Sequence, residues 1–195
     1  IIEMVIYTKK RKNRNIKNYT QKQKLKYLYP NIYKINRYQT NKKTNQFNLT
    51  GLKFEENELS ELRMSRDNYI FTVFVSDKFG DSGLTAVAFL KNLNKTNQWL
   101  VENMLMSCRV FGRQIEHALI AAIKDFVYRK NGKVLLGEFI KSKKNAPAES
   151  FFSQCRFAKV AERSEKEVWR YEISCLQVYP KHLSVNMKAF ENGQH

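Results

Sequence analysis

The sequence has few cysteines and no long apolar run. Only three cysteines occur among its 195 residues, namely Cys108, Cys155 and Cys175, at wide spacing and without a C-x-x-C pair. This pattern argues against a disulfide framework and against a zinc site, so we expect reduced thiols and no bound metal. No apolar run approaches the roughly 20 residues that a membrane-spanning helix needs. We therefore expect a cytoplasmic protein.

Acidic residues are almost absent from the first quarter of the chain. Up to Lys53 there are fourteen Lys and Arg against one acid, Glu3, which gives this part a net charge of +13. The whole chain carries +17, so the remainder is nearly balanced at +4. Residues 8–29 hold most of the excess, and their polar composition predicts an exposed segment.

Hydrophobic periodicity predicts an α+β protein. We expect strands at residues 3–7, 69–77, 84–92, 99–107, 133–140 and 168–174. We expect helices at residues 32–38, 55–64 and 148–155, and the longest one at residues 115–127, where apolar side chains line one face. A chain of this length suits one hydrophobic core. The prediction is a single domain over residues 1–175, with a mixed, mostly antiparallel sheet flanked by helices, and a tail over residues 176–195.

A glycine-bearing turn leads from the strand at residues 99–107 into the long helix. It spans Cys108 to Gln114 and places Arg109 and Arg113 on either side of Gly112. The first backbone N–H groups of a helix have no partner within the helix, and the helix dipole is positive there. Glycine lets the backbone approach a bound anion closely. The turn therefore predicts a phosphate or diphosphate site, although a glycine turn that only starts a helix has the same pattern.

This turn resembles the diphosphate-binding motif of GNAT acyltransferases. Arg109-x-x-Gly112-x-Gln114 is similar to the family pattern R/Q-x-x-G-x-G/A, at the same junction of strand and helix. The resemblance implies a GNAT-like fold and, as ligand, coenzyme A, acyl-CoA or the phosphopantetheine of a carrier protein. It implies phosphate contacts from Arg109, Val110, Gly112, Arg113 and Gln114. At Gln114 the family has a small residue.

A second segment, at residues 145–157, is also similar to GNAT proteins. It resembles the family pattern N-x-x-A-x-x-[LF]-Y-x-x-L-G-F and begins at Asn145. The resemblance implies that Asn145 and Phe152 line the pantetheine arm. In the family a Tyr at the position of Phe152 often protonates the departing thiolate. Phenylalanine has no proton to donate, so this general acid is missing here.

Four blocks resemble the carboxy-terminal region of FkbH-like proteins and occur in that family's order. They are residues 44–50, 76–83, 106–112 and 144–147. In that family a HAD-type phosphatase domain precedes this region, and the whole protein loads a glyceryl unit onto an acyl carrier protein for polyketide biosynthesis. The D-x-D-x-T/V motif of a HAD domain is missing here. The resemblance therefore implies the second half of such a protein, either an acyltransferase domain or a non-catalytic module that docks the carrier for an upstream HAD-type domain.

Three side chains are candidates for catalysis. Cys108 lies beside the helix start and two arginines, which suits an acyl-accepting nucleophile, whereas a small buried residue that ends a strand is the alternative. In GNAT enzymes a carboxylate on a central strand can act as general base for an amine, which makes Glu138 and Asp81 candidates. The alternatives are a paired strand acid for Glu138 and a solvated turn acid for Asp81.

Candidate substrate and partner contacts lie towards the amino terminus. Asn45, Gln46 and Asn48 precede the central strands, where GNAT folds place substrate-side loops, although ordinary turn capping gives the same pattern. Lys-rich segments with interleaved Tyr can bind nucleic acid, but no recognised nucleic-acid motif is present. Acyl carrier proteins are acidic, and a basic surface steers them equally well. We therefore expect an acyl carrier protein as partner, rather than nucleic acid or a membrane.

Overall fold

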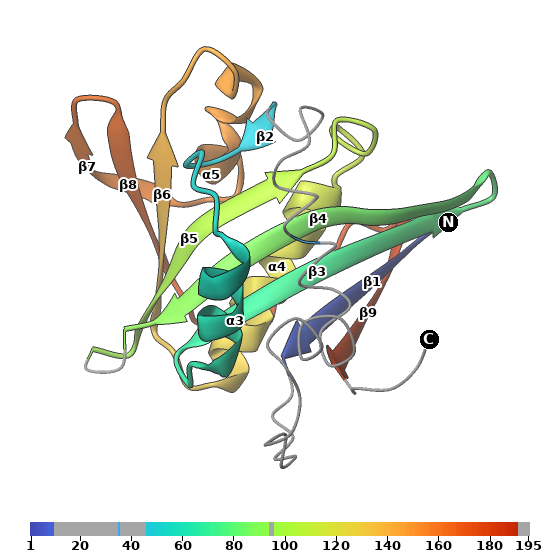
Figure 1. Ribbon diagram of the computed structural model, residues 1–195, viewed down its shortest axis with the longest axis horizontal. Coiled ribbons are helices and arrows are strands. Elements are labelled where there is room, and N and C mark those ends of the chain that lie inside the picture. The colour runs from blue at the N-terminus through green and yellow to red at the C-terminus, as the bar shows by residue number, and fades with distance from the viewer. Residues whose placement is uncertain (10–34, 36–45, 94–95, 191–195) are drawn as a thin grey trace.

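The computed structural model describes residues 1–9, 35, 46–93 and 96–190, whose strands form one sheet with helices on both faces (Figure 1). The strands are β1 (Ile2–Lys9), β2 (Phe47–Asn48), β3 (Asn68–Asp77), β4 (Gly80–Asn92), β5 (Gln98–Met106), β6 (Val134–Ile140), β7 (Ala158–Arg163), β8 (Lys166–Glu172) and β9 (Leu183–Phe190). The helices are α3 (Glu56–Met64), α4 (Ile115–Arg129) and α5 (Phe151–Gln154), with a 3-10 turn, η3, at Ala146–Ala148.

The sheet is mixed and mostly antiparallel, as the sequence predicts. Its strand order is β7-β8-β6-β5-β4-β3-β1-β9, and β2 pairs with β5 off this path. The pairs β5–β6 and β1–β9 are parallel. The other pairs are antiparallel. The parallel β5–β6 pair places the long helix α4 in the crossover between these two strands, which positions the start of α4 at the end of β5.

Each face of the sheet is covered by a helix that the sequence pattern indicates. Leu119 and Ile123 of the apolar stripe of α4 are fully buried in the larger core. On the other face Leu59 of α3 packs with Ile70 and Phe89 in a second, smaller core. Because both faces of the central strands are buried, these strands read as nearly continuous apolar runs. Among the described residues, no helix has the length and apolar character needed to span a membrane.

Local patterns predict most elements near their observed bounds. The six expected strands and the helices at residues 55–64 and 115–127 are all present. The strand β4 begins at Gly80, four residues earlier than expected, and the helix expected at residues 148–155 is divided into η3 and α5. Of the helix expected at residues 32–38, the structure describes only Ile35, which is buried in the smaller core. Of the basic segment at residues 8–29, it describes only Thr8 and Lys9, which end β1, and the rest lies outside the described residues.

Residues 176–195 were expected to form a carboxy-terminal tail, but part of this segment is a strand of the sheet. Within it β9 pairs in parallel with β1 over eight residues and completes the sheet next to the amino terminus. The connection that leads there is fixed to α4 by Asp125, whose carboxylate accepts hydrogen bonds from the Gln177 amide and the Tyr179 hydroxyl, both at 2.7 Å. The sheet therefore includes residues up to Phe190. The short strands β2 and β7 were not expected either.

Candidate functional site

The turn at residues 107–114, here called the anion turn, connects β5 to α4. Val110 is fully buried, and its amide donates to the Ser107 carbonyl at 3.1 Å, which fixes the first half of the turn. The second half has positive φ angles of +79° at Gly112 and +62° at Gln114. Reversals of the backbone of this kind turn neighbouring N–H groups towards one point, as in anion-binding nests. The backbone of the turn therefore has two left-handed residues next to the start of α4, and its binding of an anion stays a prediction.

Several backbone amides at the start of α4 have no hydrogen-bond partner among the described residues. Among the hydrogen bonds of the described residues, none uses the N–H groups of Gly112, Gln114 or the first three residues of α4. The first amide of the helix to be bonded is that of Ala118, which donates to the Gln114 carbonyl at 3.0 Å. Within the described part of the chain, no side chain caps the start of α4. Its unpaired amides and the positive end of its dipole are features that suit an anion.

The two arginines of the anion turn have different surroundings. The Arg113 guanidinium forms an ion pair with Asp77 at the end of β3, at 2.5 Å, and this hydrogen bond holds the pKa of Asp77 below its usual range. The Arg113 carbonyl also accepts a hydrogen bond from His182 Nε2 at 3.1 Å. Arg109 is exposed, and within the described part of the chain it contacts only the Ser107 hydroxyl. Arg109 therefore forms no ion pair with an acidic side chain of the described residues.

Next to the anion turn, the strands β5 and β6 separate. Their pairing runs from Gln98–Val134 to Val101–Gly137 and stops there, although both strands continue. In Figure 1 the arrows of β5 and β6 diverge beyond this point, and β2 lies between them. This separation is the gap in which the resemblance places a pantetheine arm.

Residues 47–50, here called the wedge, fill this gap. Phe47 pairs with Met106 and Asn48 with Leu105, so the wedge runs antiparallel to the free edge of β5. The Leu49 amide then donates to the Met104 carbonyl at 3.1 Å, and the Thr50 hydroxyl to the Glu102 carbonyl at 3.1 Å. On the opposite side the Ile140 amide of β6 donates to the Leu49 carbonyl at 2.9 Å. The wedge thus bridges the two strands where they no longer pair with each other.

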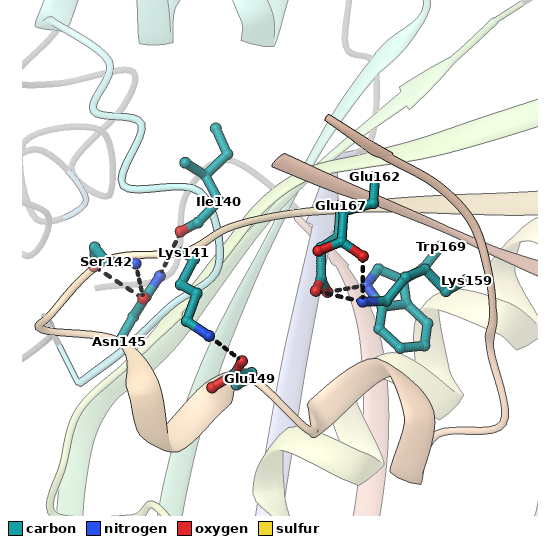
Figure 2. Close-up of polar contacts among 9 residues, drawn as sticks. All are labelled: Ile140, Lys141, Ser142, Asn145, Glu149, Lys159, Glu162, Glu167 and Trp169. Atoms are coloured by element: carbon teal, nitrogen blue, oxygen red, sulfur yellow. Dashed lines mark hydrogen bonds and ion pairs between the residues drawn. The ribbon is translucent and has the colours of Figure 1, made fainter. Parts of the chain in front are cut away.

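Asn145 holds the wedge against the end of β6. Its side-chain amide donates to the carbonyls of Asn48 at 2.8 Å and Ile140 at 3.0 Å. Its side-chain oxygen accepts from the amide and the hydroxyl of Ser142, and Figure 2 shows the contacts with Ile140 and Ser142. All polar atoms of this buried side chain are in use. In this structure Asn145 contacts the wedge, and its expected role in lining a pantetheine arm stays a prediction.

Phe152 lies in the larger core on the α4 side of the sheet. It is 1% exposed, and its ring stacks on Trp169 with ring centroids 6.1 Å apart. The ring also covers Gly137, where an added methyl group would overlap it. Gly137 is the last residue of β6 that pairs with β5, so Phe152 packs beneath the point where the strands separate.

Two carboxylates lie on the other face of the sheet at that same point. Burial raises the pKa of Glu102 on β5; the neighbouring Glu138 on β6 adds to the rise, and Lys91, whose Nζ is 3.7 Å from the carboxylate, opposes it. Glu138 forms an ion pair with Lys166 of β8 at 2.8 Å. Glu102 was not among the residues predicted from the sequence, although a charged residue within the otherwise apolar run of β5 was an available signal.

The structure does not bring the three predicted catalytic residues together. Cys108 is exposed in the anion turn, Glu138 lies at the strand separation, and Asp81 is exposed on the β3–β4 hairpin, where it accepts a hydrogen bond from the Gly83 amide at 2.7 Å. No hydrogen bond or ion pair joins any two of them in the described regions. No cluster of three or more potential metal ligands was found there either.

The three predicted substrate contacts also differ in position. Asn45 lies outside the described residues, and Gln46 is exposed just before the wedge. Asn48 is buried within the wedge, and its side-chain oxygen accepts a hydrogen bond from the Gly51 amide at 2.9 Å. In this structure Asn48 therefore stabilises the turn that ends the wedge.

Comparison with solved structures identifies the fold. A spermidine N-acetyltransferase from Vibrio cholerae is 12% identical, with a TM-score of 0.54 over 73% of this chain and 88% of that one. The ribosomal-protein-S18-alanine N-acetyltransferase of Escherichia coli is 13% identical, with a TM-score of 0.53 over 77% and 92%. A protein assigned to the GNAT family from Desulfovibrio desulfuricans is 18% identical, with a TM-score of 0.50 over 61% and 78%.

No protein-family model and no curated protein sequence matches the chain. The relationship to FkbH-like proteins therefore stays a prediction. The fold itself is confirmed by the structural neighbours: the chain has the GNAT acyl-CoA N-acyltransferase fold, with a mixed sheet that separates beside the start of its long helix.

Proposed function

We propose that the chain is an acyltransferase that binds the diphosphate of an acyl-CoA or of a carrier-bound phosphopantetheine at the anion turn. The observation that carries this proposal is the group of unpaired amides from Gly112 to the first turn of α4, beside separated strands in a GNAT fold. Gly112 and Gln114 shape the amide cluster, Val110 anchors it in the core, and Arg109 supplies an exposed charge. Arg113 positions the turn through its ion pair with Asp77.

A thioester whose diphosphate lies at the anion turn extends along β5 towards Glu102. There an acceptor amine attacks the thioester carbonyl, the carbon–sulfur bond breaks, and the amine proton passes to the Glu102 carboxylate. The raised pKa of Glu102 favours this role, because a general base works best when its pKa is close to the working pH. Phe152 is buried and has no hydroxyl, so the departing thiolate takes its proton from water.

An acidic carrier protein is the proposed donor. The loop between β6 and η3, beside the wedge, exposes Lys141, Lys143 and Lys144. Lys141 forms an ion pair with Glu149 at 2.6 Å, as Figure 2 shows. The exposed Lys143 and Lys144 of this loop and the exposed Arg109 of the anion turn add positive charge, which favours an acidic partner over a neutral one. As the prediction from FkbH-like proteins also implies, the carrier and an upstream HAD-type domain are part of this proposal.

A non-catalytic module that docks the carrier is the second candidate. It is favoured by Phe152 in place of a proton donor and by the wedge in the gap between the strands. The two candidates differ in turnover, because a docking module binds the carrier and leaves its thioester intact.

The proposed activity is tested by coenzyme A release from acetyl-CoA and longer acyl-CoAs, with spermidine and an amino-terminal alanine peptide as acceptors. The Glu102→Gln variant is expected to lose about 100-fold or more in kcat while keeping its affinity for coenzyme A, since it removes only the base. Glu138→Gln is the matched control and is expected to have a smaller effect, because Lys166 already holds Glu138. Carrier binding without turnover in the wild type supports the module instead, and binding of neither coenzyme A nor carrier contradicts both.

A further inference from the structure

The wedge occupies the path that the proposed function assigns to the pantetheine arm. Starting next to the anion turn, it follows β5 from Met106 back to Glu102, where the proposed base lies. At about 3.4 Å per residue, its four residues span roughly 14 Å of this path. We infer that the wedge is an internal occupant of the site, and that a thioester reaches Glu102 only after residues 47–50 have left. This inference rests on the proposed function.

The wedge uses backbone groups on both sides of the gap. The Met104 and Glu102 carbonyls of β5 each accept a hydrogen bond from it. On the β6 side the Ile140 amide and the Asn145 side chain donate to it. A pantetheine arm carries two amide groups, which need donors and acceptors of the same kind when they are buried between strands. The arm and the wedge therefore compete for one set of partners.

The side chains of the wedge also exclude a pantetheine arm from the gap. Phe47 and Leu49 are fully buried in the larger core. The Phe47 ring lies 5.5 Å from that of Phe111 in the anion turn and 5.0 Å from that of Phe151 in α5. Since buried cores are close-packed, an arm and these two side chains do not fit in the gap together. Contact with Phe111 also links the position of the wedge to the shape of the anion turn.

The wedge ends in a residue suited to a hinge. Gly51 is exposed and has a φ of +71°, a conformation that side-chain-bearing residues rarely adopt. Its amide is held by the Asn48 side chain at 2.9 Å, and the Leu52 carbonyl beyond it accepts from the Asn103 side chain at 3.0 Å. Beyond Leu52 the chain continues towards α3. The hinge therefore separates the removable wedge from a fixed part of the fold.

This arrangement divides the ligands of the site into two classes. A diphosphate without an arm binds the free amides at the anion turn with the wedge in place. A ligand with an arm binds only the fraction of molecules whose wedge has left, so its apparent affinity is lowered in proportion to that fraction. Anything that loosens the wedge therefore strengthens binding of coenzyme A and leaves binding of the arm-free diphosphate unchanged.

A reversible lock tests the inference. Asn48→Cys and Leu105→Cys place thiols on directly opposite residues of β2 and β5, within reach of a disulfide. Both changes are made together with Cys108→Ser, which removes the exposed thiol of the neighbouring turn. The ligands are coenzyme A and 3′-phosphoadenosine 5′-diphosphate, which is coenzyme A without its arm. The Cys108→Ser single variant, oxidised and reduced in parallel, is the control.

The locked protein is expected to bind coenzyme A at least about tenfold more weakly than the reduced protein does, whereas the arm-free ligand is expected to bind both states with the same affinity. If coenzyme A binds equally tightly to the locked and the reduced protein, the inference about the wedge is overturned and the proposed function is not. Equal affinities for the two ligands in both states also overturn it, because the arm then never enters. Binding of neither ligand in either state refutes the proposed function and the inference with it.

Hydrogen exchange in the unmodified chain gives a second test that needs no lock. The Leu49 amide is protected by its bond to Met104, and it is expected to exchange at least several-fold faster when coenzyme A is bound but not when the arm-free ligand is bound. As a variant, Asn48→Ala removes the bond to Gly51 and is expected to tighten coenzyme A binding by about two- to tenfold. The exposed Glu172→Gln is its control. Unchanged Leu49 exchange on coenzyme A binding, or unchanged affinity in Asn48→Ala, contradicts a wedge that moves.

Discussion

Substitutions of Gly112 distinguish the effect of backbone shape at the anion turn from the effect of charge there. Its φ is +79°, and among the described residues no atom lies within 4 Å of the position that a Cβ would take. A side chain there therefore meets no obstacle and costs only the backbone strain of a left-handed residue, about 1–2 kcal/mol. Gly112→Ala and Gly112→Glu share this strain and differ in charge. Both are expected to lower Tm by about 2–8 °C in a chain of this size.

The affinities of the two variants are expected to differ strongly. A carboxylate about 5 Å from a diphosphate, with two charges and an effective dielectric constant of about 40, repels it by about 3 kcal/mol. This corresponds to about a 100-fold weaker binding for Gly112→Glu than for Gly112→Ala. Isothermal titration of coenzyme A and of the arm-free diphosphate measures the ratio, which added salt is expected to reduce. If Gly112→Ala and Gly112→Glu bind these ligands with equal affinity while both variants remain folded, the diphosphate does not lie at this turn.

Three further predictions concern the stability of the fold. Burial lowers the pKa of Lys124 from 10.5 to about 8, so the unfolded chain takes up this proton at a higher pH than the folded chain does. The free energy of unfolding is therefore expected to decrease by up to about 3 kcal/mol as the pH falls from 10.5 to 8. Urea unfolding at each pH measures this decrease, with Lys124→Met as the reference. Gly137→Ala places a methyl group on the ring of Phe152 and is expected to cost about 1–3 kcal/mol, measured by thermal unfolding; an unchanged Tm contradicts this packing. Tyr179→Phe removes a hydrogen bond to the buried Asp125 and is expected to lower the free energy of unfolding in urea by about 1–3 kcal/mol. An unchanged free energy of unfolding would mean that this contact does not hold the connection to β9.

Elements with local patterns are those that the sequence predicts well. The long helix α4 is expected at residues 115–127 and spans Ile115–Arg129, because its apolar stripe repeats with the helical period over several turns. The anion turn is predicted for the same reason, since its glycine, its arginines and the helix start all lie within eight residues. Local information also places α3, which begins with a capping box at Glu55 and Glu58.

The sequence prediction missed three strands, each for a different reason. β2 has two residues, and its pairing with Met106 joins positions far apart in the chain, so no periodicity reveals it. All six residues of β7 are exposed, which leaves no apolar face to recognise. β9 had a usable signal, because Leu183, Val185 and Met187 alternate with polar residues, and it was nevertheless placed in a tail.

Only the part of the candidate site that lies within one short segment could be predicted from the sequence. Local sequence indicates the anion turn, whereas the wedge and the position of Glu102 beside Glu138 depend on the register between β5 and its neighbours. Asn145 shows the difference within one residue. The resemblance places it at the gap between the strands, but only the structure shows that its side chain contacts Asn48 there. A segment that fills a site cannot be found from the residues that form the walls of that site.

Amide NMR during a titration with coenzyme A tests the central claim most directly. The claim is that the unpaired backbone amides at Gly112, Gln114 and the first turn of α4 receive the diphosphate. The expected result is a saturable shift that is largest at these amides and is reproduced there by the arm-free diphosphate. Saturable binding of coenzyme A that leaves these amides unshifted, with the changes elsewhere on the sheet, would contradict the claim.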